Sequence, residues 1–172
     1  MANLIGKHII LRALEPEDLD FLYTTENNER FWEISSTQVP FSKYLLKQYI
    51  TNAHQDIYEA KQYRFVICNS ENIQVGMIDL FDFNPQHNRV GIGILILPEF
   101  ENKGFAAEGL ELTIDYAFQY LNVHQIFANI TSENTKSIAL FEKFNFKLTG
   151  NKKDWIYSKQ QYKDELLYQL IK

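Results

Sequence analysis

Residues 91–121 form the part of the chain that most restricts its fold: a strand, a short polar loop and a long helix. Residues 89–97 are almost continuously apolar and rich in β-branched side chains, which indicates a buried central strand. Pro98 cannot donate to a sheet and ends that strand. Residues 99–104 are polar and turn-prone. From Ala106 onward the apolar residues recur at helical spacing, at Leu110, Ile114, Ala117 and Leu121.

The loop before this helix contains Gly104 and leads directly into the helix N-terminus. The first N–H groups of a helix have no partner within the helix, and the helix dipole is positive at that end. Such a loop can bind an anion, most naturally a phosphate group. An ordinary strand–turn–helix connection has the same pattern, so the loop alone leaves both interpretations open.

The composition predicts one globular domain over residues 1–172. The chain is 45% apolar and 23% charged, and it contains no repeat, linker-like segment or apolar run of the roughly 20 residues that a membrane span needs. A single cysteine, Cys68, excludes an internal disulfide and favours a reducing, cytoplasmic location. The net charge of −5 argues against nucleic-acid binding and favours a cationic substrate. No histidine or cysteine cluster predicts a metal site.

Apolar spacing and turn residues predict the other elements. Residues 63–68, 74–83 and 89–97 should form an antiparallel meander, because only short turns separate them. Further strands are expected over residues 8–14, 125–131, 147–157 and 162–171. Helices are expected from Glu15 to near Asn27, over residues 43–60 after a cap at Ser42, and over residues 135–144 after a cap at Asn134. Residues 28–41 lack a clear period and are expected to be a loop.

With this order of elements, three segments resemble the GCN5-related N-acetyltransferase (GNAT) superfamily, and the resemblance covers essentially the whole chain. They are PEFENKGFAAEGL at residues 98–110, ENTKSIALFEKFNF at residues 133–146 and LRALEPEDLDFLY at residues 11–23. IDLFDFNPQHNR at residues 78–89 is similar to spermidine acetyltransferases, which places the chain nearest the ribosomal-protein and spermidine branch. The resemblance implies a mixed α/β fold with a mostly antiparallel seven-stranded sheet and about four helices.

The resemblance also implies acetyl-CoA as the acetyl donor, bound beside the central strand. Small residues leave backbone N–H groups uncrowded, so that they can hold a diphosphate. The amides implied for this role are those of Asn102, Lys103, Gly104, Ala106 and Ala107. The strand residues implied to pair with the pantetheine arm are Ile94, Leu95 and Ile96. The second cofactor segment contributes Asn134, Ser137, Phe141 and Lys143. Asn134 either contacts pantetheine or caps its helix, and the sequence leaves both roles open.

Several residues depart from the family pattern. Glu101 stands where the family usually has glutamine or arginine, and its side chain is expected to turn to water. Asn102 and Asn145 replace glycines, which asparagine can do because it tolerates a left-handed backbone. Phe141 replaces a tyrosine that in spermidine enzymes protonates the leaving thiolate. Gly91 stands where this branch often has a glutamate.

An ammonium group must lose its proton before it attacks a thioester, so a base or a water relay is needed. The candidate catalytic residues are Asp79, Glu33 and His87, and the candidate substrate-binding residues are Trp32, Glu33 and Asp82. Asp79 shares a strand face with Met77 and Phe81, where burial would make it a better base. Each aspartate is alternatively a solvated strand-end residue, and His87 a surface residue in a turn. Other aromatic residues that could line an acceptor pocket are Phe31, Trp155, Tyr157 and Tyr162.

These observations predict an N-acetyltransferase in which a primary amine attacks acetyl-CoA directly, because nothing pairs Cys68 with a base. A polyamine or diamine is the favoured acceptor, and a protein N-terminus of the ribosomal-protein type is the alternative. A second alternative is an acyl-CoA-binding module with weak catalysis, which Glu101, Gly91 and Phe141 favour. No nucleic-acid or membrane partner is expected, and a homodimer is compatible with the family.

Overall fold

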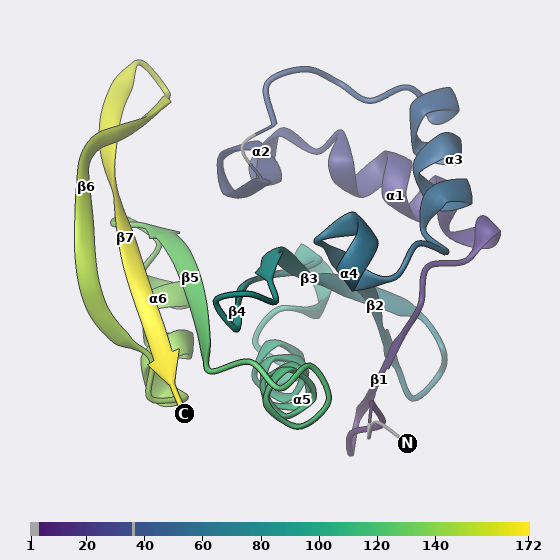
Figure 1. The fold of residues 1–172 in the computed structure, drawn as a ribbon. Helices are drawn as coiled ribbons and strands as arrows, with labels where there is room; N and C mark the ends of the chain where they lie inside the picture. The colour runs from purple at the N-terminus through teal and green to yellow at the C-terminus, as the bar shows by residue number, and fades with distance from the viewer. Residues whose placement is uncertain (1–3, 36) are drawn as a thin grey trace.

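A seven-stranded sheet forms the centre of the molecule (Figure 1). The computed structural model describes residues 4–35 and 37–172. The strand order is β1-β2-β3-β4-β5-β7-β6, and β4 and β5 are parallel while every other neighbouring pair is antiparallel. The strands are β1 (Ile9–Arg12), β2 (Tyr63–Asn69), β3 (Gln74–Asn84), β4 (Arg89–Ile96), β5 (Gln125–Thr131), β6 (Lys147–Ser158) and β7 (Gln161–Ile171). The predicted meander and the final strand pair are therefore confirmed.

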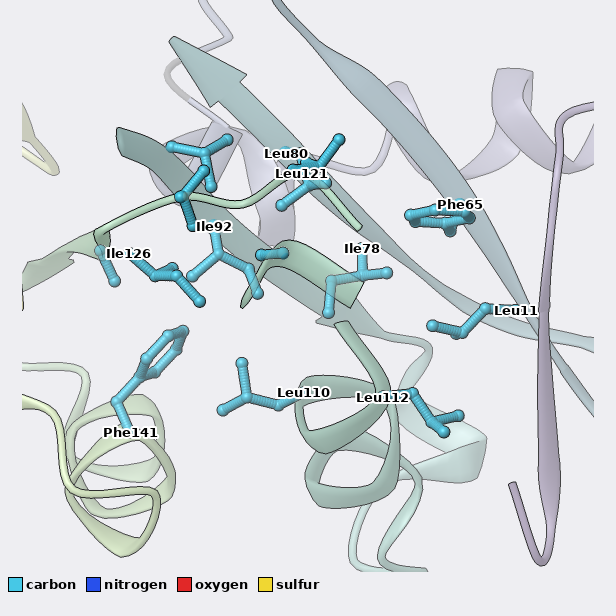
Figure 2. Packing of buried hydrophobic residues seen from close by; sticks show 14 of the residues in the cluster. Leu11, Phe65, Ile78, Leu80, Ile92, Leu110, Leu112, Leu121, Ile126 and Phe141 are labelled. Carbon is cyan, nitrogen blue, oxygen red and sulfur yellow. The ribbon is translucent and has the colours of Figure 1, made fainter. Parts of the chain in front are cut away.

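Helices cover both faces of this sheet. The described residues form six α-helices: α1 (Leu19–Glu26), α2 (Glu29–Ser35), α3 (Lys43–Asn52), α4 (Ile57–Ala60), α5 (Phe105–Gln119) and α6 (Thr135–Lys143). Short 3-10 turns lie at Pro16–Asp18 and Pro98–Phe100. On one face, Leu22 of α1 and Leu46 of α3 pack on Met77 of β3. On the other face, Leu110 of α5 and Phe141 of α6 point toward Ile92 and Ile126 (Figure 2).

Two predictions about the helices were wrong, and the expected number of about four was too low. Residues 28–41 contain α2, which is short and buries only Phe31, so it shows no period. The predicted helix over residues 43–60 is two helices, α3 and α4. Asp56 accepts from the N–H groups of Tyr58 and Glu59 and starts α4 anew. In α3, Leu46 is buried, whereas Leu45 is 48% exposed.

Candidate active site

The sheet splits between β4 and β5. These strands pair only at Arg89–Gln125, Val90–Ile126 and Gly91–Phe127. Beyond Gly91, β4 stays paired with β3 while β5 stays paired with β7. Among the residues that the structure describes, the edge of residues 92–96 that faces β5 therefore has no strand partner, and it includes Ile94, Leu95 and Ile96. Free backbone groups along such an edge can pair with an extended ligand.

Aromatic rings stand where the split begins. The rings of Phe81 and Phe127 meet edge to face, with centroids 5.5 Å apart. Phe81 lies over Gly91 so closely that a Cβ atom there would come within 2.3 Å of its ring. The space that a glutamate side chain would need at position 91 is thus filled by Phe81. This end of the cleft is apolar.

The loop after β4 has the backbone geometry of an anion site. Asn102 has φ 60° and Gly104 has φ 82°, and these two left-handed residues turn the chain into α5. Apart from Gly104 and its two chain neighbours, no described residue has an atom within 4 Å of the position of a Gly104 Cβ, so the backbone is open there. Ala106 and Ala107 lie in the first turn of α5, where N–H groups lack helix partners. Uncrowded N–H groups at the start of a helix can bind an anion such as a phosphate group.

Glu101, the residue before this loop, does not turn to water, contrary to the prediction. Its carboxylate accepts from Arg30 of α2 at 2.5 Å and from Lys136 of α6 at 2.9 Å. The hydrogen bond from Lys136 and the charge of Arg30 lower the pKa of Glu101, so it stays ionised. The carboxylate is therefore part of an ion-pair cluster that joins three elements.

The second predicted cofactor segment forms α6 and its ends. The Asn134 side chain accepts from the N–H of Ser137 at 3.2 Å, so it caps the helix. Phe141 is buried and packs edge to face on Phe146. Lys143 is exposed and lies over the ring of Phe144. Asn145 has φ 65° and, like Asn102, is in the left-handed region as predicted.

Asp79 is the candidate base nearest to the split, because it pairs across β3 and β4 with Gly93. Arg64 of β2 donates to both of its carboxylate oxygens, at 2.6 and 2.7 Å, and also to Glu26 of α1. Burial would lower the pKa of Arg64, but the charge of Asp79 and its hydrogen bonds hold that pKa well above the ordinary value. Tyr49 covers the guanidinium with its ring. Asp79 is thus held in place by two hydrogen bonds from one guanidinium group.

Glu33 of α2 is tied to the hairpin of β6 and β7. Ser158 donates to one carboxylate oxygen at 2.6 Å, and Lys163 donates to both at 3.0 Å. Lys163 also pairs with Glu133 at 2.8 Å, and only 6% of its side chain is exposed. The Ser158 hydrogen bond, together with Lys163, lowers the pKa of Glu33 below its ordinary value. On the same helix, the Trp32 indole N–H donates to the Glu26 carbonyl.

The remaining candidates lie apart from this cluster. Asp82 and His87 are exposed at the end of β3 and in the turn before β4, on the closed side of the split. Phe31 is buried, whereas Trp155, Tyr157 and Tyr162 of the β6–β7 hairpin are 62–65% exposed. The structure therefore brings Asp79 beside the split and places Trp32 and Glu33 on one helix. His87 lies apart from these three residues.

Sequence reasoning missed the cations that hold these carboxylates. Arg64 did carry a signal, because it is the one charged residue in the otherwise apolar strand YRFVIC. A buried arginine is almost always paired. Lys163 and Arg30 lie in ordinary polar stretches and carried no such signal.

Among residues 4–35 and 37–172, no three histidine, cysteine, aspartate or glutamate side chains come together as metal ligands would. None of the helices in this described part of the chain is long and apolar enough to cross a membrane.

Residues 8–147 match the family model described as acetyltransferase (GNAT) domain. Spermidine N(1)-acetyltransferase of Vibrio cholerae is 28% identical over 163 residues, covering 93% of this chain and 91% of that protein. A crystal structure of the Vibrio cholerae spermidine N-acetyltransferase with CoA and spermine superposes with a TM-score of 0.88, at 26% identity and 96% coverage of both chains. A dodecameric structure of the same enzyme gives a TM-score of 0.82 at 28% identity, covering 96% of this chain and 95% of that one.

Proposed function

Because the chain belongs to the acetyltransferase (GNAT) domain family, we propose that it transfers the acetyl group of acetyl-CoA to a primary amine of a polyamine. The observation that carries this proposal is the split between β4 and β5, with the Gly104 loop following β4. The solved relative that binds CoA and spermine supports the choice of a polyamine, as does the net charge of −5.

The coenzyme would lie along the unpaired edge of β4. The backbone of Asn102, Lys103 and Gly104 and the first turn of α5 would hold its diphosphate, and the β4 edge would pair with its pantetheine arm. A β4 N–H aimed at the thioester oxygen would stabilise the negative charge that develops there during attack. Asn134 would act by capping α6 rather than by direct contact.

Asp79 would act on the acceptor amine. Its carboxylate is 37% exposed and lies next to the split, so it can attract an ammonium group and take up its proton directly or through water. Trp32 and Glu33 would line the same side from α2, where Glu33 adds negative charge. We assign no step to Asp82 or His87, since both lie in the exposed region at the closed end of the split. Phe141 has no proton to give, so the thiolate would leave without help from that position.

The test is thiol release from acetyl-CoA with a panel of spermidine, diamines, aminoglycosides and peptides with free N-termini. Saturable release with polyamines alone supports the proposal, whereas release with peptides alone favours the protein N-terminal alternative. Asp79→Asn should lower kcat with spermidine by about 100-fold, and Asp82→Asn, the matched variant, by less than about threefold. Coenzyme binding without turnover of any amine would contradict the proposed activity.

We also propose that the protein is a cytoplasmic homo-oligomer. The dodecameric relative supports assembly. The exposed rings of Trp155, Tyr157 and Tyr162 on the β6–β7 hairpin offer apolar surface for it. Light scattering coupled to size-exclusion chromatography tests the oligomeric state, and Tyr162→Ser should weaken it if the hairpin takes part.

A further inference from the structure

Three charged side chains meet beside the loop that precedes α5. Glu101 accepts from Arg30 and from Lys136, at 2.5 and 2.9 Å. The two cations remain 52% and 73% exposed, while the carboxylate is 23% exposed. Each belongs to a different part of the fold: Arg30 to α2, Lys136 to the first turn of α6, and Glu101 to the segment between β4 and α5. The cluster therefore joins both sides of the split.

The position of the cluster matters because Asn102 and Gly104 follow Glu101 directly. A carboxylate alone at the start of a diphosphate loop would repel the ligand. Here it is outnumbered by the two cations, so the cluster carries a net charge of +1. A guanidinium fork matches two oxygens of a phosphate as well as it matches a carboxylate. The same two side chains can therefore serve either anion.

We propose that Arg30 and Lys136 bind the diphosphate of the coenzyme, and that Glu101 is an internal anion that holds these two cations beside the loop until the diphosphate takes them over. This inference rests on the proposed function, because it needs a coenzyme at the Gly104 loop. The exchange is feasible since exposed ion pairs contribute little to stability and break easily. It also gives α2, which carries Trp32 and Glu33, a direct contact with the coenzyme.

The test measures dissociation constants by calorimetry for CoA, dephospho-CoA and pantetheine, of which only pantetheine lacks the diphosphate. Arg30→Gln and Lys136→Gln should each weaken the binding of CoA and of dephospho-CoA by about 5- to 20-fold and leave the affinity for pantetheine unchanged. Glu101→Gln should raise the affinity for both ligands that carry a diphosphate by about two- to fivefold, because the competing carboxylate is gone. Lys43→Gln is the matched control: it removes an equally exposed cation whose partner is Asp20.

Four outcomes would overturn the proposal. Equal losses for pantetheine and CoA would mean that the substitutions disturb the fold, which melting curves would also reveal. If only the affinity for CoA fell, and that for dephospho-CoA did not, the two cations would bind the 3′-phosphate instead of the diphosphate. Unchanged affinity in both variants would reduce the cluster to a surface ion pair while leaving the proposed function intact. Failure of the wild-type protein to bind CoA at all would remove the proposed function as well.

Discussion

The two sides of the split are built by different means. On the side proposed to bind the coenzyme (the coenzyme side), the shape comes from the main chain: left-handed residues at Asn102 and Gly104, and the first turns of α5 and α6. On the side proposed to bind the acceptor amine (the acceptor side), it comes from buried cations, Arg64 and Lys163, each held between two carboxylates from distant segments. A main-chain site can be encoded in a short motif, whereas an ion-pair site exists only once the tertiary fold has formed.

The acceptor side also has an excess of negative charge. Glu26 and Asp79 share Arg64, and Glu33 and Glu133 share Lys163. Each cluster of two carboxyl groups and one cation therefore has a formal net charge of −1. The nearby loop cluster around Glu101 has the opposite balance, because there one carboxylate faces two cations. This distribution places positive charge where an anionic ligand would bind and negative charge where a cationic one would.

The largest effect expected from breaking this arrangement is that of Arg64→Met. The substitution leaves Asp79 and Glu26 without their buried partner and should lower the free energy of unfolding by about 3–5 kcal/mol, measured by urea titration. The control is Lys43→Met, which removes an exposed pair with Asp20 and should leave the free energy of unfolding nearly unchanged. Equal losses in the two variants would show that the acceptor side does not depend on its buried cation.

Gly91→Ala tests the aromatic end of the split. The new Cβ would overlap the Phe81 ring, so the free energy of unfolding should fall by about 1–3 kcal/mol. Phe81→Ala removes the obstacle, and the double variant should therefore lose less than the sum of the two single losses. Additive losses would mean that the ring and the glycine are not coupled.

Gly104→Ala tests the main-chain side. No neighbour would clash, but φ of 82° strains any residue with a side chain, so the loss should be about 1–2 kcal/mol of unfolding free energy. Gly93→Ala is the control, since its Cβ would meet only one Phe81 atom, at an ordinary 3.9 Å, and φ is not positive there. If Gly104→Ala changed neither the free energy of unfolding nor coenzyme binding, the loop would not need a glycine at this left-handed position.

The sequence predicted the main-chain side well, because its signals are local. Pro98, Gly104 and the caps at Ser42 and Asn134 each act within a few residues, and the structure confirms the strand end, the loop and both caps. It failed on α2, a seven-residue helix whose Arg30 and Glu33 bond to residues far along the chain. It also failed on Glu101, whose partners lie 71 and 35 residues away in the chain. No short motif encodes such distant pairs.

The smallest expected effect is on the contact between α2 and the β6–β7 hairpin. The pKa of Glu33 is lower in the folded protein than in the unfolded chain, where it is about 4.3, so the folded state binds its proton less tightly. Its contribution to stability is therefore fully present above that value and is lost as the pH falls through the lowered pKa of the folded protein.

Glu33→Gln should accordingly cost less than about 1 kcal/mol of unfolding free energy at pH 7, because Lys163 keeps Glu133 as a partner. The difference from wild type should shrink below about pH 4, as seen in urea titrations between pH 3 and pH 7. Glu133→Gln is the matched variant, since it removes the other, more exposed partner of the same lysine. A difference that grows toward acid pH would mean that Glu33 is protonated more easily in the folded protein, and that Lys163 does not hold its charge.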